Sequence, residues 1–208
     1  YGLITTVRKS FRYLKHKIKE PQLSADIECL DYMFFKNTRI LESDSSSIVP
    51  ISTSIDIVVP IYNGYELLMT LLKSIDNTRM QHRVILIDDC SPDKRISPIL
   101  EQYKAEHPRA ILIRNERNLG FVETVNRGLR CSSGHVALVN TDVELPANWL
   151  ERLMQPIIKG NRIASSTPFT NSGTICSFPK FLEDNELYCK LDLATIDAAF
   201  SMIKPAYP

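Results

Sequence analysis

Side chains suited to binding a diphosphate and a metal ion stand at the ends of two apolar segments of the chain. Asp88 and Asp89 close the segment at 83–88, and Asn140 and Asp142 close the segment at 135–140. Adjacent carboxylates repel each other unless a cation or a hydrogen-bond donor compensates their charge. Mg²⁺ or Mn²⁺ takes one or two protein carboxylates and fills its other positions with phosphate oxygens and water. The alternative is a purely structural role, in which Asn and Asp cap the helices that follow.

Other phosphate-binding motifs are missing from the sequence. No GxGxxG follows the first apolar segment, and GxxxxGK[ST] does not occur, so neither a dinucleotide-binding turn nor a P-loop is predicted. The four histidines are scattered without a Ser/His/Asp or Cys/His arrangement. With only seven glycines in the chain, a cradle of backbone amides is poorly supported. A bound diphosphate would therefore depend on a divalent cation, either Mg²⁺ or Mn²⁺.

The elements that must position these residues alternate regularly from residue 55 onward. Apolar, β-rich segments predict strands over 55–62, 83–88, 110–115, 135–140 and 162–167. Helices are predicted over 66–75, 96–106, 122–131 and 147–158, with another over 193–203 and an acidic helix start near 183–186. This alternation is typical of an α/β fold with a mostly parallel sheet covered on both faces. Ligands of such sheets bind beyond the carboxyl ends of the strands.

Composition narrows the class of protein. Apolar residues make up 44% and charged residues 24% of the 208 residues, as in a globular domain. The formal net charge is only +1, which argues against a nucleic-acid partner. The five cysteines show no zinc spacing and are odd in number, so a reducing, cytoplasmic location is predicted. Because the chain begins at Tyr1 rather than Met, we expect it to be a fragment of a longer protein.

The chain divides on composition into residues 1–50 and residues 51–208. Residues 5–20 carry six basic side chains and an apolar stripe at helical spacing, which predicts a basic amphipathic helix. Such a helix could contact anionic lipid at the inner face of a membrane, or it could dock its stripe on a neighbouring domain. Residues 21–50 have the composition of a linker.

Taken in order, the strand-end motifs resemble those of family 2 glycosyltransferases with the GT-A fold. The motifs are VVPIYNG (58–64), VILIDDCSPD (84–93), NERNLGFVETVNRGL (115–129), LVNTDVELPANWL (138–150) and STPFTNSGTICSFP (166–179). They look most like the bacterial branch of rhamnosyl- and O-antigen-type transferases. The resemblance implies a Rossmann-like GT-A sheet flanked by helices, incomplete here at the C-terminus, and a role in a bacterial surface polysaccharide.

The resemblance also implies roles for individual residues. The residues expected to contact the nucleotide are Pro60, Tyr62, Asn63, Asp88, Asp89, Asn118, Gly120, Asn126, Arg127 and Asn140. The first three would hold the nucleobase, and one member of the Asp88-Asp89 pair would accept from its imide N–H; which one stays open. Asn140 would contact ribose or metal-bound water. Asp142 would bind the divalent cation that bridges the diphosphate.

The implied reaction is transfer of a sugar from a nucleoside diphosphate sugar to a glycan or lipid-linked glycan acceptor, metal-assisted and inverting. Its catalytic base is expected beyond Pro208, so no catalytic residue is assigned and the fragment alone is expected to be inactive. One alternative is a non-catalytic nucleotide-sugar-binding or scaffolding module. Another is a nucleotidyltransferase, which would need a Gly-rich basic loop that IYNGYELL (61–68) does not provide. The sequence leaves the roles of two side chains near the motifs undecided. Trp149 either packs its helix onto the sheet or stacks on a sugar. Cys90 either lies near the nucleobase or fills a turn.

Overall fold

The structure is a computed structural model of the chain, and it describes residues 55–159, 163–172, 176–178, 180, 182–186 and 192–201. The predicted basic helix at 5–20 and the linker at 21–50 lie outside the described residues. Described residues up to Leu150 belong to one compact unit, and those from Glu151 onward belong to a second. No helix of the described part is long and apolar enough to cross a membrane.

The first unit is built on a four-stranded sheet in the order β3-β2-β1-β4. The strands are β1 (Ile55–Ile61), β2 (Arg83–Asp88), β3 (Ile111–Arg114) and β4 (His135–Leu138), and every neighbouring pair is parallel. Runs such as IDIVVPI and RVILID form central strands because their apolar, β-branched side chains are buried on both faces of the sheet. The predicted α/β class with a mostly parallel sheet is confirmed.

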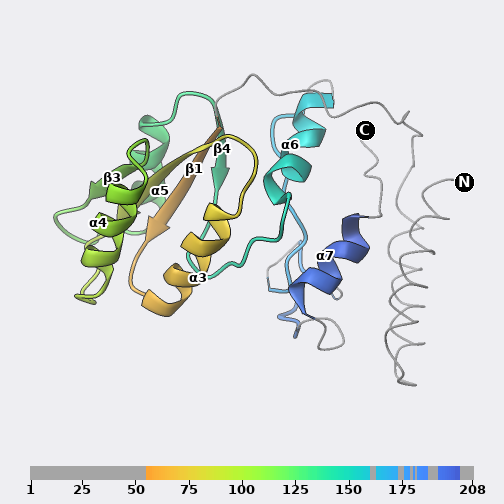
Figure 1. Cartoon of the computed structure of the whole chain (residues 1–208). Helices are drawn as coiled ribbons and strands as arrows, with labels where there is room; N and C mark the ends of the chain where they lie inside the picture. The colour runs from red at the N-terminus through yellow and green to blue at the C-terminus, as the bar shows by residue number, and fades with distance from the viewer. Residues whose placement is uncertain are drawn as a thin grey trace, which may run out of the picture. The chain divides into compact units, whose positions relative to one another are not determined.

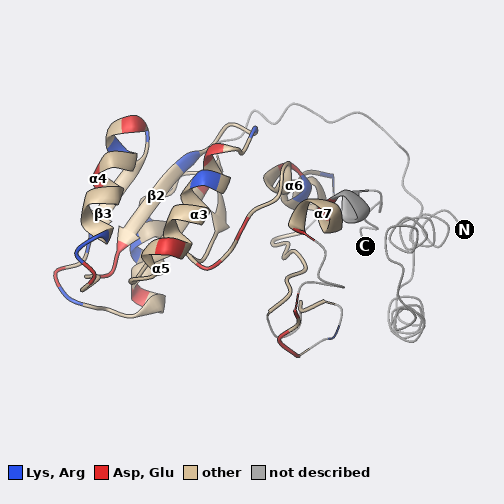
Figure 2. Ribbon diagram, turned by 60° about the horizontal axis from the view of Figure 1, so that its bottom comes forward, with Lys and Arg blue, Asp and Glu red and all other residues tan. Residues whose placement is uncertain are grey.

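Helices cover both faces of this sheet. They are α3 (Tyr65–Asp76), α4 (Ile96–Glu106) and α5 (Phe121–Arg130). Right-handed crossovers place the two helices of the β1-to-β2 and β2-to-β3 connections on one face, and the helix of the reversed β3-to-β4 connection on the other. Figure 1 shows this arrangement, with α5 behind the sheet. Lys and Arg are interspersed with Asp and Glu over these helices (Figure 2).

The face under α5 packs closely against the helix. Val58, Ile85 and Ile87 are fully buried there, and partly buried side chains of β3 and β4 pack against them. Gly128 of α5 lies directly over this cluster: a Cβ atom at this position would come within 2.6 Å of Val58 Cγ1 and 2.8 Å of Ile87 Cδ1. Because Gly128 has no side chain, the backbone of α5 can approach the sheet closely. This close packing sets the distance between α5 and the sheet.

An ion pair between Asp56 and Arg83 joins the strands at the amino-terminal edge of the sheet, and the Asp56 carboxylate is buried. Asp56 accepts hydrogen bonds from Arg83 Nε and Nη2, both at 2.8 Å, and from the backbone N–H of Ser133 at 2.9 Å. Burial raises the pKa of Asp56, but these three donors outweigh burial and lower it overall. The contact ties β1, β2 and the turn before β4 together at the edge away from the polar strand ends.

The second unit contains the rest of α6 (Trp149–Lys159) and α7 (Leu193–Ser201). The predicted strand at 162–167 is wrong over its described residues 163–167, because Ala164, Ser165 and Thr167 are exposed and the segment lacks the burial that a central strand of a covered sheet requires. The predicted acidic helix start at 183–186 is also wrong. Asn185 instead accepts the N–H of Lys180 and donates to the carbonyls of Lys180, Glu183 and Asn171, which closes a loop.

The start of α6 also differs from the prediction. A helix was expected from residue 147, but Asn148 has φ 60° and the helix begins at Trp149. Trp149 is buried, and its Nε1–H donates to Thr78 Oγ1 at 2.9 Å. The packing role predicted for Trp149 is therefore the one that the structure supports, and its ring is not presented to a sugar.

Candidate functional site

The polar residues that follow the strands share one edge of the sheet, because the carboxyl ends of parallel strands lie together. The strand order reverses next to β1: the chain moves from β1 outward through β2 to β3 and then returns to place β4 on the other side of β1. Open α/β sheets bind ligands in the crevice at such a reversal. The loops after β1 and β4 lie on either side of this reversal.

The loop after β1 presents Tyr62 and fixes Asn63. Tyr62 is 51% exposed, whereas Asn63 is half-buried with φ 60°. The Asn63 N–H donates to Ser91 Oγ at 3.0 Å, and its Oδ1 accepts from the N–H of Asp93 at 3.1 Å. Asn63 thus joins the loops after β1 and β2, and Tyr62 is the side chain of this pair that is open to a ligand.

Pro60 lies inside β1 without disturbing the sheet. Val58 O accepts from Val139 N–H on the β4 side, and by alternation the nitrogen of residue 60 also faces that side. The β4 pairing ends at Val58–Leu138, so the missing N–H of proline removes no sheet hydrogen bond. Pro60 therefore lies just beyond the point where β1 and β4 cease to pair.

Asp88 and Asp89 are both buried but differ in what they hold. Asp89 Oδ1 accepts from Leu119 N–H at 2.8 Å and Asn115 Nδ2 at 2.6 Å, and its Oδ2 accepts from Gly120 N–H at 2.9 Å. Burial raises the pKa of Asp89, but the hydrogen bonds from Leu119, Asn115, Thr124 and Gly120 lower it overall. Its carboxylate is fully used in folding the loop before α5.

Asp88, in contrast, has one carboxylate oxygen that no described residue engages. Its Oδ1 accepts from the N–H of Ser91 at 3.0 Å, and no described residue donates to Oδ2. The residue is only 7% exposed, but this oxygen is not completely buried. The two adjacent carboxylates that looked equivalent in sequence therefore differ: both oxygens of Asp89 accept from the protein, whereas only one oxygen of Asp88 does.

A buried asparagine connects Asp89 to α5. Asn115 Nδ2 donates to Asp89 Oδ1 and, at 2.9 Å, to Thr124 Oγ1, while Asn115 Oδ1 accepts from Arg127 Nη1. Asn115 is absent from the residues predicted to contact the nucleotide. Its position directly after an apolar strand was the one sequence signal that pointed to the site. The sequence does not show that both polar atoms of its side chain form hydrogen bonds within the protein.

The remaining predicted residues of this region lie around the start of α5. Asn118 Oδ1 accepts from Gly120 N–H at 2.9 Å, and Gly120 adopts φ 80° and ψ 166°, a conformation that glycine tolerates best. Asn126 is half-buried, and its side chain has no hydrogen bond to a described residue. Cys90 is exposed, with φ 58°, and its Sγ lies 3.7 Å from Glu116 O. The thiol is thus not the semi-buried filler predicted for this turn.

Asn140 and Asp142 follow β4, which lies on the other side of β1 from β2, and both are exposed. Neither side chain hydrogen-bonds to a residue that the structure describes, so the Asp142 carboxylate is uncommitted. Within the described ranges, no group of three His, Cys, Asp or Glu side chains could by itself enclose a metal ion. An isolated exposed carboxylate fits a cation that takes most of its ligands from phosphate and water.

A replacement of Asp89 tests the structural role assigned to it. Asp89→Asn removes the charge and leaves one of the two loop N–H groups poorly paired, so we expect a loss of about 1–2 kcal/mol in unfolding free energy at pH 7. A lowered pKa stabilises the fold above the unfolded-state value of about 4, and this contribution disappears as pH falls through the folded-state pKa. Urea unfolding from pH 7 to pH 3 should therefore show the gap between wild type and variant closing in acid. The exposed Glu144→Gln is the matched control, and an equal loss there would contradict the assignment.

Comparison with known proteins gives a family match over most of the described part. The model of the family described as Glycosyl transferase family 2 matches residues 56–187. Dolichol-phosphate mannosyltransferase of Pyrococcus furiosus is 27% identical over 128 residues, which is 60% of this chain and 36% of that protein. N-acetylgalactosaminyltransferase 7 of Drosophila melanogaster is 27% identical over 113 residues, 51% of this chain and 19% of that protein. The chain thus spans about a third or less of the length of these relatives.

Two solved structures align with about half of the chain. Mannosyltransferase PcManGT from Pyrobaculum calidifontis, in complex with GDP-Man and Mn²⁺, aligns with a TM-score of 0.46 at 24% identity, over 50% of this chain and 32% of that one. TarS 1-349 of S. aureus, in complex with UDP-GlcNAc, aligns with a TM-score of 0.46 at 24% identity, over 51% of this chain and 31% of that one.

Proposed function

The chain belongs to glycosyl transferase family 2, and from this premise we propose that it binds a nucleoside diphosphate sugar at the carboxyl edge of its sheet. The observation that carries the proposal is the strand order, which reverses between β1 and β4, with Tyr62 in the loop after β1 and Asp142 in the loop after β4. The sugar would be transferred to a glycan or lipid-linked glycan with inversion. We further propose a bacterial surface polysaccharide as the product.

We assign the nucleobase to the loops after β1 and β2. A base with an imide N–H, as in uracil, thymine or guanine, needs an acceptor oxygen that the protein does not already use. Asp88 Oδ2 is such an oxygen, whereas both oxygens of Asp89 already accept from the protein. Tyr62 supplies an exposed aromatic face for the base. Asn63 and Asp89 act indirectly, by holding the loops in place.

The diphosphate end of the donor is assigned to Asp142. Its uncommitted carboxylate would hold Mg²⁺ or Mn²⁺, and neutral Asn140 would contact the ribose or a metal-bound water. A bound divalent cation stabilises the negative charge that develops on a leaving diphosphate. Asn118, Gly120, Asn126 and Arg127 would line the donor site from the β3–α5 side. Residues 5–20 would approach an anionic membrane surface from the cytoplasm, beside a lipid-linked acceptor.

Titration calorimetry with UDP, dTDP and GDP tests this assignment. Each nucleotide is added to the whole chain with Mn²⁺ and again with EDTA. We expect one of the three to bind saturably with Mn²⁺ and at least about tenfold more weakly with EDTA, because the cation bridges Asp142 and the diphosphate. Failure of all three to bind would contradict the proposal. The sugar nucleotide of the base that binds is then supplied with candidate glycan acceptors, and release of nucleoside diphosphate that depends on the acceptor separates a transferase from a binding module.

A further inference from the structure

The guanidinium group of Arg95 contacts side chains from two different segments at the carboxyl edge of the sheet. Arg95 directly precedes α4, and it donates to Asp93 Oδ2 through Nη2 at 2.8 Å and to Asp93 Oδ1 through Nε at 3.1 Å. Its Nη1 donates to Glu66 Oε1 at 2.8 Å, and its Cζ lies 4.6 Å from the centroid of the Tyr65 ring. Asp93 belongs to the loop after β2, whereas Tyr65 and Glu66 open α3 immediately after the loop that follows β1.

Hydrogen bonds of Asn63 continue this contact into the two loops. The Asp93 N–H donates to Asn63 Oδ1 at 3.1 Å, and the Asn63 N–H donates to Ser91 Oγ at 3.0 Å. The Ser91 N–H in turn donates to Asp88 Oδ1 at 3.0 Å. A chain of contacts therefore runs from Arg95 to Asp88.

The loop after β1 depends on contacts of this kind because its backbone is left-handed at two successive residues. Asn63 has φ 60° and Gly64 has φ 72°. A left-handed backbone at a residue other than glycine costs energy and persists only where the surrounding structure holds it. Tyr62 directly precedes this turn, so the direction of its exposed side chain depends on the contacts that fix the turn.

The exposure of Arg95 decides between a stabilising role and a positioning role. The side chains of Arg95 and Glu66 are 56% and 74% exposed, and ion pairs this open to water add little to the free energy of unfolding. The guanidinium is nevertheless restricted, since it meets two carboxylates and the face of Tyr65. Its main effect is then to limit the movement of one loop relative to the other, which lowers the ordering cost of binding a ligand that contacts both.

The position of Arg95 indicates that it acts on such a ligand indirectly. The groove that it lines between α3 and α4 includes Tyr65 and Ile99, but neither Tyr62 nor Asp88. Tyr62 instead follows β1, and Asp88 closes β2. Arg95 is thus placed to hold the loops rather than to contact a base bound by these two residues.

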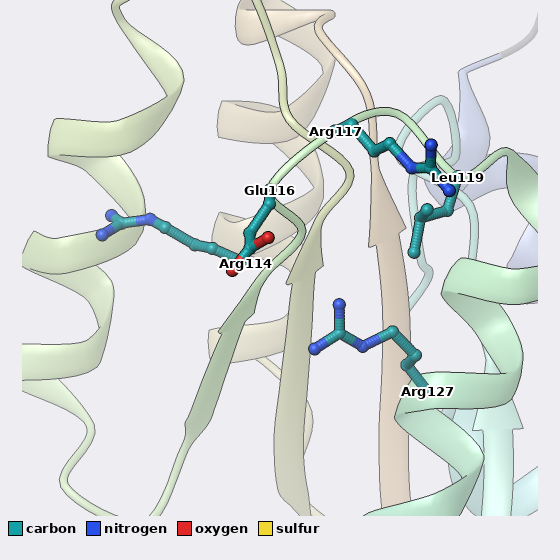
Figure 3. A pocket seen from close by; sticks show the side chains of 5 residues that line it. All are labelled: Arg114, Glu116, Arg117, Leu119 and Arg127. Atoms are coloured by element: carbon teal, nitrogen blue, oxygen red, sulfur yellow. The ribbon is translucent and has the colours of Figure 1, made fainter.

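Other arginines at this edge of the sheet make different connections. Figure 3 shows Arg114 and Arg127 around the pocket that follows β3, with Arg114 extended toward α4. Arg114 pairs with Glu101 of α4 at 2.8 Å, and Arg127 donates to Asn115. Neither contact involves the loop after β1. Of the arginines that the structure describes, Arg95 is the one whose ion pairs join the start of α3 to the loop after β2.

We propose, on the basis of the nucleotide site assigned above, that Arg95 is a positioning residue for the nucleobase. It fixes the loop after β1 against the loop after β2, and the Tyr62 ring is thereby kept at the distance from Asp88 that the base requires. In this arrangement Arg95 touches neither the base nor the diphosphate. Its loss should therefore weaken binding of the base and leave binding of the metal-bound diphosphate unchanged.

Calorimetry of the whole chain in Mn²⁺ tests this role with two probes, the nucleoside diphosphate that wild type binds and pyrophosphate, which has no base. We expect Arg95→Gln to weaken nucleotide binding about fivefold, a modest loss because exposed ion pairs are individually weak, and to change pyrophosphate binding by less than about twofold. Arg95→Lys keeps the charge but not the fork, so its affinity for the nucleotide should be intermediate. Lys94→Gln removes an adjacent exposed charge and should leave both affinities unchanged.

A double-mutant cycle, which needs only the nucleotide as a probe, tests the route through Asn63. Asn63→Gly removes the side-chain oxygen that accepts from Asp93, and glycine tolerates the left-handed backbone at this position. Because the link to Arg95 is then already broken, Arg95→Gln should weaken nucleotide binding by less than about twofold in the Asn63→Gly background. An equal effect of Arg95→Gln in both backgrounds overturns the route.

The outcomes distinguish this proposal from the proposed function. Absence of nucleotide binding in wild type contradicts the nucleotide site itself. Nucleotide binding that is present in wild type and unchanged in Arg95→Gln overturns the positioning role alone, as does an equal loss of nucleotide and pyrophosphate affinity. Thermal unfolding checks the fold of each variant. A midpoint of Arg95→Gln that lies many degrees below that of Lys94→Gln would assign Arg95 to fold stability and also overturns the proposal.

Discussion

Asp142→Asn is expected to weaken Mn²⁺-dependent nucleotide binding by about 100-fold, which corresponds to roughly 3 kcal/mol of binding free energy. Asp142 is exposed and no described residue hydrogen-bonds to its side chain, so the replacement removes the charge that attracts the cation without removing a contact that stabilises the fold. The unfolding midpoint should therefore stay within a few degrees of wild type. Calorimetry with the nucleotide that binds wild type, in Mn²⁺ and in EDTA, measures the effect.

The matched control for this prediction is Glu144→Gln, an exposed carboxylate two residues further along the same loop. It removes an equal charge from the same region and should change the affinity by less than about threefold, since long-range electrostatics between exposed groups are screened. An unchanged affinity in Asp142→Asn would show that this carboxylate is not the cation ligand. An equal loss in both variants would show that only the net charge of the loop matters.

Gly128→Val is expected to lower the unfolding free energy by about 3 kcal/mol, at the upper end of the range for overpacked cores. The new Cβ would fall 2.6 Å from Val58 Cγ1 and 2.8 Å from Ile87 Cδ1. Val58 is fully buried and β-branched, so it cannot turn away without a strained rotamer. The helix must then move off the sheet. Urea unfolding followed by circular dichroism gives the change directly.

A double-mutant cycle separates this clash from a general intolerance of the helix. Val58→Ala removes the atom nearest to the added Cβ, so Gly128→Val should cost less in the Val58→Ala background than in wild type by at least about 1 kcal/mol. Simple additivity of the two losses would place the cause elsewhere than in the close approach of α5 to β1. A shift of α5 would also disturb the candidate site, because Thr124 and Arg127 of this helix hydrogen-bond to Asn115.

The parallel sheet was predictable from sequence because its strands are short, mostly apolar segments that alternate with amphipathic helices. Strands and helices up to residue 146 were placed within one or two residues of their observed ends. Prediction failed further on, where periodicity is weak. The strand was predicted at 162–167 from β-rich composition, without a clear period. The helix start at 183–186 was predicted from acidic residues, but the side-chain hydrogen bonds of Asn185 close a loop over those residues.

The site was predictable as a set of polar residues at strand ends but not as a set of roles. Asp88 and Asp89 are chemically identical in sequence. They differ only because the loop before α5 directs the N–H groups of Leu119 and Gly120 at Asp89. Those donors lie about 30 residues away along the chain. Asn115 was overlooked for the same reason, since its value lies in three side-chain partners that only the folded chain brings together.

The most direct test of the nucleotide site is the effect of Mn²⁺ on backbone amide signals of ¹⁵N-labelled protein saturated with the nucleotide that binds, with Mg²⁺ as the diamagnetic reference. We predict selective broadening of residues 62–64 and 139–143, while residues near Asp56 and Ser133 keep their signals. The length of β1 separates these two edges by about 20 Å. Broadening that is centred on the Asp56 edge, or that is the same without nucleotide, would contradict a metal-bridged diphosphate at the carboxyl edge of the sheet.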